Sequence, residues 1–142
     1  MLLFLLTTWT ASSGTHTSQY QAVLTTGGTS DGAFAFDTDH YVLEAKWWKD
    51  AIGRRELDVF KSNIERKGKN TLGLYVSMSG FTSDALAVYS FSTPFITMDG
   101  LDFTAVLDQR IRLDELIRRK KRHASETGHC SLPVAKIFSG TN

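Results

Sequence analysis

The chain has 142 residues, of which 42% are hydrophobic and 22% charged, and its formal net charge is +1. This length suits one domain that buries about two-thirds of its unfolded surface, and the composition excludes a largely disordered chain. The single cysteine, Cys130, excludes an internal disulfide, and no Cys/His cluster has the spacing of a zinc site. We therefore expect a globular protein of a reducing compartment, the cytoplasm.

The first thirty residues contain no Asp, Glu, Lys or Arg and open on an apolar stretch. A secretory signal is disfavoured because the positively charged n-region is missing and the apolar stretch is short. The same stretch is too short to span a bilayer, so we expect no membrane partner. We interpret it as the tail of a core helix followed by a loop, in a domain that is shortened at its N-terminus.

Strands come first along the rest of the chain. Residues 19–24 predict a strand, and the stretch "TTGGTS" leads from it into a hairpin. The two strands of that hairpin are expected at residues 32–36 and 41–47, joined by the turn "DTDH".

Helices and strands then alternate. In order, the sequence predicts a helix at residues 53–69, a strand at 71–79, a helix at 80–90, a buried strand at 94–100, and helices at 101–109 and 112–128. Leu57, Phe60 and Ile64 form the apolar stripe of the first helix, and Thr82 or Ser83 is the expected N-cap of the second. This order predicts an α/β fold with a central mixed β-sheet flanked by helices, in one domain spanning residues 1–142.

The hairpin is predicted to bring three charged residues to one face. We expect Phe36 to pair with Tyr41 across the turn. In that register Asp31 lies opposite Lys46, and Glu44 is a diagonal neighbour of Asp31, with Cα atoms roughly 7–8 Å apart. Two carboxylates at this distance can hold one cation. The other face is expected to be apolar and to carry Phe34, Phe36, Leu43 and Trp47.

Two interpretations are open for this charged cluster. An ammonium beside carboxylates is most simply a salt bridge on a solvated face. On a half-buried sheet, however, such a cluster is costly unless its members are paired or bound to a metal. Asp37 lies at the tip of the hairpin, ~23 Å along the strand from Glu44, and is too distant to join the cluster.

Three segments of the sequence resemble one nuclease family. They are "DGAFAFDTDHYVLEAKWW" at residues 31–48, "LDVFKSNIERKGKNTLGLYVSMSGF" at residues 57–81 and "TSDAL" at residues 82–86. The spacing of Asp31 from Glu44-x-Lys46 is similar to that of the PD-(D/E)xK nuclease superfamily, and the segments together resemble its Mrr-type restriction endonuclease domains. The resemblance implies a restriction-endonuclease-like core at residues 18–110, with a C-terminal helical extension at residues 111–142.

The resemblance also implies a divalent-metal site. Asp31 and Glu44 would be its carboxylate ligands and the carbonyl of Ala45 a third, with Mg²⁺ or Mn²⁺ as the ion. Lys46 would lie beside the attacking water, and the domain would hydrolyse DNA in prokaryotic restriction or defence. Many family members carry a further acid on a helix before the Asp, and no acid precedes Asp31 here. The alternative is therefore a catalytically impaired module of the same fold that binds nucleic acid or protein.

Contacts to DNA are expected at residues outside the charged cluster. They are Trp48, Ser79, Arg118, Arg119, Lys121 and Arg122. A tryptophan can stack on a base or sugar, and basic or short hydroxyl side chains can bind phosphate. The alternatives are turn chemistry for the serine and a solvated face near a helix C-terminus for the basic run "RRKKRH". A homodimer is also compatible with these expectations.

Overall fold

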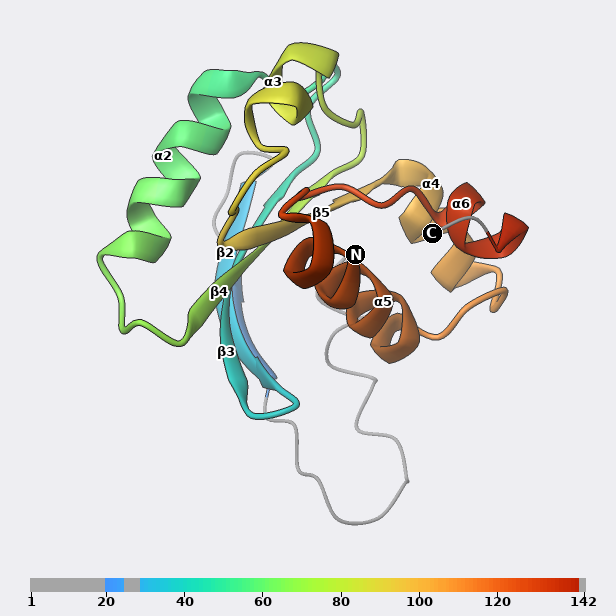
Figure 1. The fold of residues 1–142 in the computed structure, drawn as a ribbon, viewed down its shortest axis with the longest axis horizontal. Helices are drawn as coiled ribbons and strands as arrows, with labels where there is room; N and C mark the ends of the chain where they lie inside the picture. Colours follow the sequence, from blue (N-terminus) through green and yellow to red (C-terminus); the bar gives the residue numbers. More distant parts are fainter. Residues whose placement is uncertain (1–19, 25–28, 141–142) are drawn as a thin grey trace.

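The computed structural model describes the backbone of residues 20–24 and 29–140 and the side chains of residues 32–140 (Figure 1). The helix tail and loop predicted near the N-terminus therefore lie outside the described residues. Within the described part of the chain, every helix is too short or too polar to traverse a lipid bilayer.

Five strands form one mixed sheet. The elements in chain order are β1 (Tyr20–Leu24), β2 (Thr29–Phe36), β3 (Asp39–Lys46), α2 (Arg54–Glu65), β4 (Thr71–Ser77), α3 (Ser83–Val88), β5 (Phe95–Asp99), α4 (Gly100–Leu107), α5 (Leu113–Thr127) and α6 (Val134–Ser139). The strands lie in the sheet in their chain order. The first three pair antiparallel, whereas β3, β4 and β5 pair parallel. The predicted α/β fold with a central mixed sheet is confirmed.

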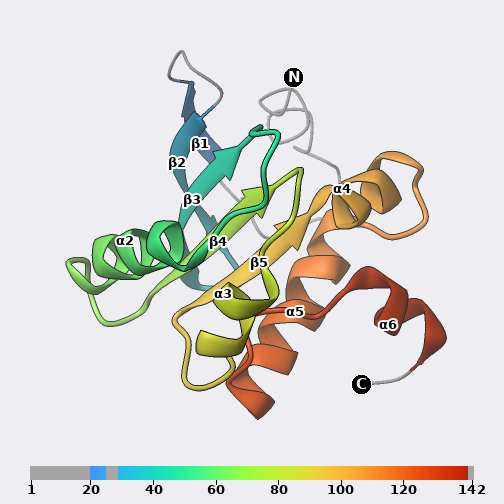
Figure 2. The same cartoon turned by 90° about the horizontal axis from the view of Figure 1, so that it is seen from above.

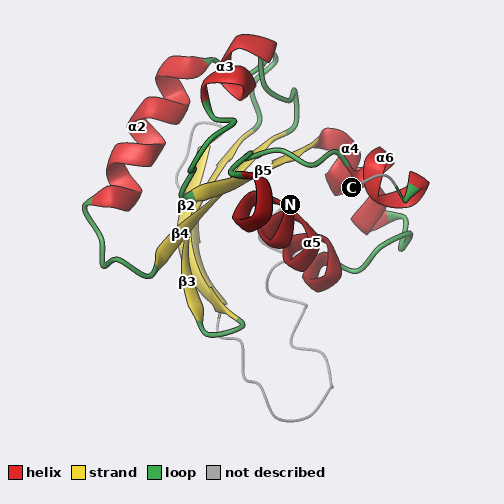
Figure 3. Cartoon of the chain, viewed as in Figure 1, coloured by secondary structure: helices red, strands yellow, loops and turns green. Residues whose placement is uncertain are grey.

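Helices cover both faces of the sheet (Figures 2 and 3). Helices α2 and α3 pack on one face, and α4, α5 and α6 pack on the other. The core under α2 and α3 contains Ile52, Leu57, Phe60, Ile64, Tyr75, Ala85, Tyr89, Phe95 and Cys130. The core under α4 and α5 is larger and contains Phe34, Phe36, Tyr41, Leu43, Ala45, Leu74, Val76, Ile96, Met98, Ala105, Leu116, Ile117 and Val134. Strands β3, β4 and β5 each therefore contribute one face to each of the two cores, as the two-residue period of a strand requires.

Helix α2 lies close to the sheet because β4 carries a glycine beneath it. The side chains of Leu57, Phe60 and Ile64 are buried, as their spacing predicted. A Cβ added at Gly73 would lie 2.3 Å from the Ile64 Cδ1 atom and 2.7 Å from the Phe60 Cε1 atom. The absence of a side chain at this position thus sets the distance between helix and sheet.

Local signals located the start of α3 and the end of α5, whereas α2 ends at Glu65, before the predicted residue 69. The Thr82 side chain accepts a hydrogen bond from the backbone N–H of Ala85 at 3.2 Å and caps α3. Helix α5 ends at Thr127 and is capped by Gly128, which has a φ of +81°. The sequence did not predict α6 as a separate helix, because it is six residues long and has only Pro133 before it as a start signal.

The register of the β2–β3 hairpin differs from the predicted one. Phe36 pairs with Asp39, and only Asp37 and Thr38 form the turn, with φ values of 51° and 87°. A two-residue turn with positive φ at both positions matches the twist of the flanking strands and is the commonest hairpin connection. The register moves by two residues as a result. Side chains keep their predicted faces, because only an odd shift would exchange them.

A buried ion pair connects three segments on the α5 face of the sheet. Lys120, which belongs to the basic run, is only 2% exposed. It donates to the Asp102 Oδ2 atom at 2.8 Å and to the carbonyl of Leu132 at 2.8 Å. The Asp102 carboxylate also accepts from the backbone N–H of Asp99 and from that of Val134, each at 3.0 Å. This network holds α4, α5 and the segment before α6 together.

Replacing one partner of this pair should destabilise the domain strongly. In Lys120→Met the carboxylate of Asp102 would stay buried without its counter-ion, so we expect the free energy of unfolding to fall by about 3–5 kcal/mol. Urea denaturation followed by circular dichroism measures the change. The matched control is Lys121→Met, whose ion pair with Asp39 is partly exposed and should be worth about 1 kcal/mol or less. Equal losses in the two variants would contradict this account.

Candidate active site

The candidate site lies where the parallel strands end. Lys46 is level with Ser77 of β4, and Ser77 is level with Asp99 of β5. From these positions the chain leaves the sheet toward α2, α3 and α4. The carboxyl ends of parallel strands are the usual location of ligand sites in α/β sheets, because the connecting loops diverge there.

Asp31 and Glu44 are directly opposite each other on β2 and β3. Opposed residues of an antiparallel pair share a face, with Cβ atoms about 4.5–5.5 Å apart. Lys46, two residues beyond Glu44 on the same strand, lies opposite Thr29 and is the diagonal neighbour of Asp31. The three residues therefore share one face, as predicted. The exact pairing was predicted wrongly, because Lys46 and not Glu44 was expected opposite Asp31. The corrected register brings the two acids nearer to each other.

Glu44 and Lys46 form a sheltered ion pair. The Lys46 Nζ atom is 3.4 Å from the Glu44 Oε1 atom, and the two side chains are only 12% and 16% exposed. The opposite face of β3 carries Tyr41, Leu43 and Ala45, all buried. Packing of these three residues fixes the strand, so the alternate positions Glu44 and Lys46 must project on the α2 side. At 12–16% exposure the pair is not a freely solvated surface bridge.

The donor set suits a hard divalent cation. Carboxylates are the oxygen ligands that Mg²⁺ prefers while it keeps several waters, and the backbone register puts two such residues level on adjacent strands. The carbonyl of Lys46 accepts from the backbone N–H of Met78 on the β4 side. Because carbonyl directions alternate along a strand, the carbonyl of Ala45 points toward β2, the strand of Asp31. Among the side chains from residue 32 to residue 140, no three His, Cys, Asp or Glu residues gather around a common point.

The segment "GLYVSMSGF", residues 73–81, forms hydrogen bonds with the residues that follow Lys46. The backbone N–H of Ile52 donates to the carbonyl of Gly80, and the N–H of Thr82 donates to the carbonyl of Ile52, both at 2.9 Å. The Ser77 hydroxyl donates to the Gly80 carbonyl at 2.8 Å. The Ser79 hydroxyl, expected to contact DNA, donates to the carbonyl of Trp48. Short polar residues in this turn therefore brace the end of β3, a role that the sequence pattern alone did not reveal.

The two tryptophans that follow Lys46 have different surroundings. Trp47 was predicted to fill the apolar core, but it is 38% exposed and packs edge-on against Phe103, with ring centroids 5.9 Å apart. The prediction failed because β3 ends at Lys46, after which strand alternation no longer sets side-chain direction. Trp48 is 41% exposed, and its ring lies over the Lys46 ammonium, 4.0 Å from the ring centroid.

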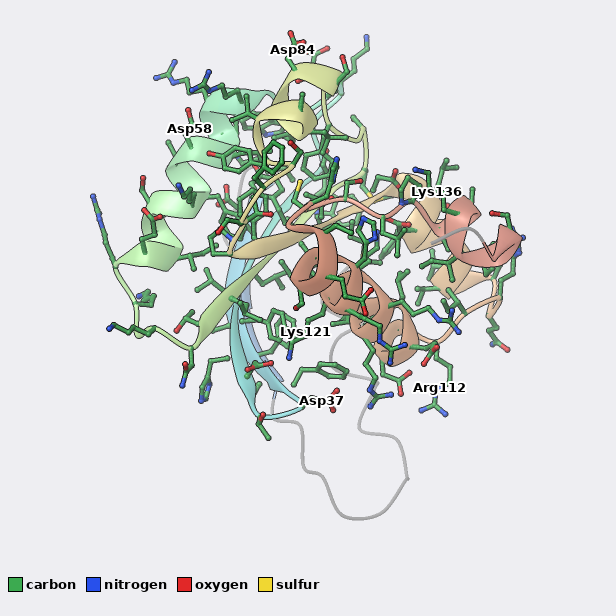
Figure 4. All side chains as sticks on the ribbon, in the orientation of Figure 1. Asp37, Asp58, Asp84, Arg112, Lys121 and Lys136 are labelled. Carbon is green, nitrogen blue, oxygen red and sulfur yellow. The ribbon has the colours of Figure 1, made fainter. Side chains whose placement is uncertain are left out.

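The basic run on α5 is not part of this cluster, because α5 packs on the other face of the sheet. Arg118 binds Asp37 at 3.0 Å and Asp114 at 3.3 Å, and Lys121 binds Asp39. Arg119 and Arg122 are exposed, and Arg119 pairs with Glu115 at 2.7 Å. Figure 4 shows Lys121 on α5 and Asp37 at the hairpin tip. The structure thus brings part of the basic run to the hairpin turn.

Cys130 does not have the environment of a nucleophile. Its side chain is 1% exposed in the core under α2 and α3. Burial raises the pKa of the Cys130 thiol to about 12, so it stays protonated near neutral pH and is a packing residue.

A family model described as restriction endonuclease, of the Mrr catalytic type, matches residues 11–107. Searches of curated proteins and of solved structures found no significant match. The matched region covers more than half of the chain and includes all five strands, the Asp31–Glu44 pair and the turn that braces Trp48. The chain belongs to the Mrr-type restriction endonuclease family.

Proposed function

We propose that this domain is a divalent-metal-dependent endonuclease that hydrolyses phosphodiester bonds of DNA, in prokaryotic restriction or defence. The observation that carries the proposal is the β2–β3 register, in which Asp31 is directly opposite Glu44 and Lys46 follows on the same face. Family membership supports the same reaction class. The cytoplasm is the compartment in which such an enzyme would meet its substrate.

Asp31 and Glu44 would hold the metal ion through their carboxylates, with the Ala45 carbonyl as a third ligand. A bound Mg²⁺ or Mn²⁺ would lower the pKa of a coordinated water and offset charge on the phosphoryl oxygens. The role of the two acids is to bind the ion at a defined place on the sheet. Because they lie on adjacent hydrogen-bonded strands, their separation is set by the sheet and not by a loop.

Lys46 would act on the nucleophile and on the developing negative charge. Its ammonium is 3.4 Å from the Glu44 carboxylate, so it would also lie close to a water held at the metal. An ammonium in a partly buried site stabilises negative charge more effectively than one in water, and it is already oriented before the reaction. The hairpin would therefore supply one cationic group and three ligand groups, namely the two carboxylates and the Ala45 carbonyl.

The central prediction separates Asp31 from Asp37. Asp31→Asn should abolish metal-dependent nicking of plasmid DNA and weaken Mn²⁺ binding, because it removes one charged ligand. Asp37→Asn is the matched control, since Asp37 lies at the hairpin tip and binds Arg118. It should cleave at a rate close to wild type. Agarose gels with Mg²⁺, Mn²⁺ or EDTA measure cleavage, and calorimetry measures Mn²⁺ binding.

Two results would count against the proposed reaction. Cleavage that persists in EDTA would exclude a metal-dependent mechanism. A wild-type protein that binds DNA but does not cut it with any divalent ion would instead favour the catalytically impaired binding module of the same fold. Loss of activity in Asp37→Asn with retention in Asp31→Asn would overturn the site assignment.

The contribution of α5 to DNA binding can be tested by measuring how the binding constant depends on salt concentration. Arg119→Gln/Arg122→Gln leaves the ion pairs between α5 and the hairpin intact. If both side chains bind phosphate, the slope of log K against log salt should become less steep by roughly two. The full replacement of Arg118, Arg119, Lys121 and Arg122 should flatten it further. Fluorescence anisotropy over a salt series measures the slope. An unchanged slope would mean that the basic residues of α5 face solvent and do not contact DNA.

A further inference from the structure

The ammonium of Lys46 has an aromatic ring over it as well as a carboxylate beside it. The Nζ atom lies 4.0 Å from the centroid of the Trp48 ring and 3.4 Å from the Glu44 Oε1 atom. The lysine side chain is 12% exposed, whereas Trp48 is 41% exposed. The ring thus covers the ammonium from the solvent side, in the geometry of a cation–π interaction.

Hydrogen bonds to the β4–α3 turn hold the backbone before and after Trp48. The carbonyl of Lys46 accepts from the N–H of Met78 at 3.3 Å, and the carbonyl of Trp48 accepts from the Ser79 hydroxyl. Farther along, Ile52 is bonded to Gly80 and Thr82. The segment that carries the indole is therefore attached to the β4–α3 turn at Lys46, Trp48 and Ile52, and this attachment fixes the backbone position from which the ring reaches Lys46.

The ring and the carboxylate would serve Lys46 differently during the reaction. A carboxylate that binds a metal ion has less negative charge to offer an adjacent ammonium, so the Glu44–Lys46 attraction would weaken when the ion is bound. The indole face attracts the ammonium through its quadrupole and does not ligate the metal. It would keep the ammonium in place in the metal-bound state without accepting a conventional hydrogen bond from it.

We propose that Trp48 is a positioning residue that holds the Lys46 ammonium at the metal-bound water, and that it acts on the chemical step and not on DNA affinity. This role rests on the proposed endonuclease function. It differs from the base-stacking role expected from the sequence, because a residue that stacks on DNA would change affinity. The two roles predict opposite kinetic effects.

Steady-state kinetics on a duplex oligonucleotide separate the two roles. Trp48→Leu should lower kcat by roughly twofold to thirtyfold, the range that corresponds to loss of a cation–π contact, with KM and DNA affinity within a factor of about two. Trp48→Phe keeps an aromatic face and should recover a substantial part of kcat. Trp47→Leu is the matched control, since Trp47 packs on Phe103, and it should leave kcat nearly unchanged.

A rise in KM with unchanged kcat in Trp48→Leu would overturn the proposal and assign the ring to DNA contact. Equal kcat values in the Leu and Phe variants would also overturn it. Nuclear magnetic resonance of the full chain tests the contact without catalysis. The Lys46 Hε protons should be shifted upfield by the ring current in wild type and in Trp47→Leu, and not in Trp48→Leu. Absence of that shift would refute the contact, whereas a shift in a wild-type protein that cuts no DNA would refute the proposed function instead.

Discussion

The pairing register of the β2–β3 hairpin is the constraint on which the candidate site depends. It places Asp31 opposite Glu44, and a change of one residue would move the two acids to opposite faces of the sheet. The turn that sets this register contains only Asp37 and Thr38, both with positive φ. Helix α5 holds the turn from the other side, because Arg118 binds Asp37 and Lys121 binds Asp39. Part of the basic run therefore supports the hairpin whose far end carries the site.

One face of β3 packs in the core, and the other carries the charged residues of the candidate site. Tyr41, Leu43 and Ala45 pack into the core under α4 and α5, with the Tyr41 ring stacked on Phe34 at 4.9 Å. This packing fixes the face of the strand from which Glu44 and Lys46 project. Rigid strands are better supports for such groups than loops, because small displacements of a reacting group reduce catalysis.

The end of β3 is stabilised by a segment distant in sequence. The β4–α3 turn binds the chain after Lys46 through Ser79 and Gly80, and Ser77 in turn bonds to Gly80. Gly73, earlier in the same motif, lets α2 approach the sheet. The motif "GLYVSMSGF" thus has a structural explanation at most of its polar and small positions. This motif connects the segment that carries Trp48 to strand β4 in the core.

The sequence by itself determined the features that depend on neighbours along the chain. Periodicity located α2 and its buried stripe, Thr82 and Gly128 marked helix ends, and alternation assigned Asp31, Glu44 and Lys46 to one face. Only the tertiary structure decided the register, the burial of Lys120 against Asp102, and the position of Trp48 over Lys46. These depend on turn geometry and on contacts between distant segments. A run of basic letters does not distinguish a lysine that is 2% exposed from a solvated arginine, because packing of the helix against the sheet makes that difference.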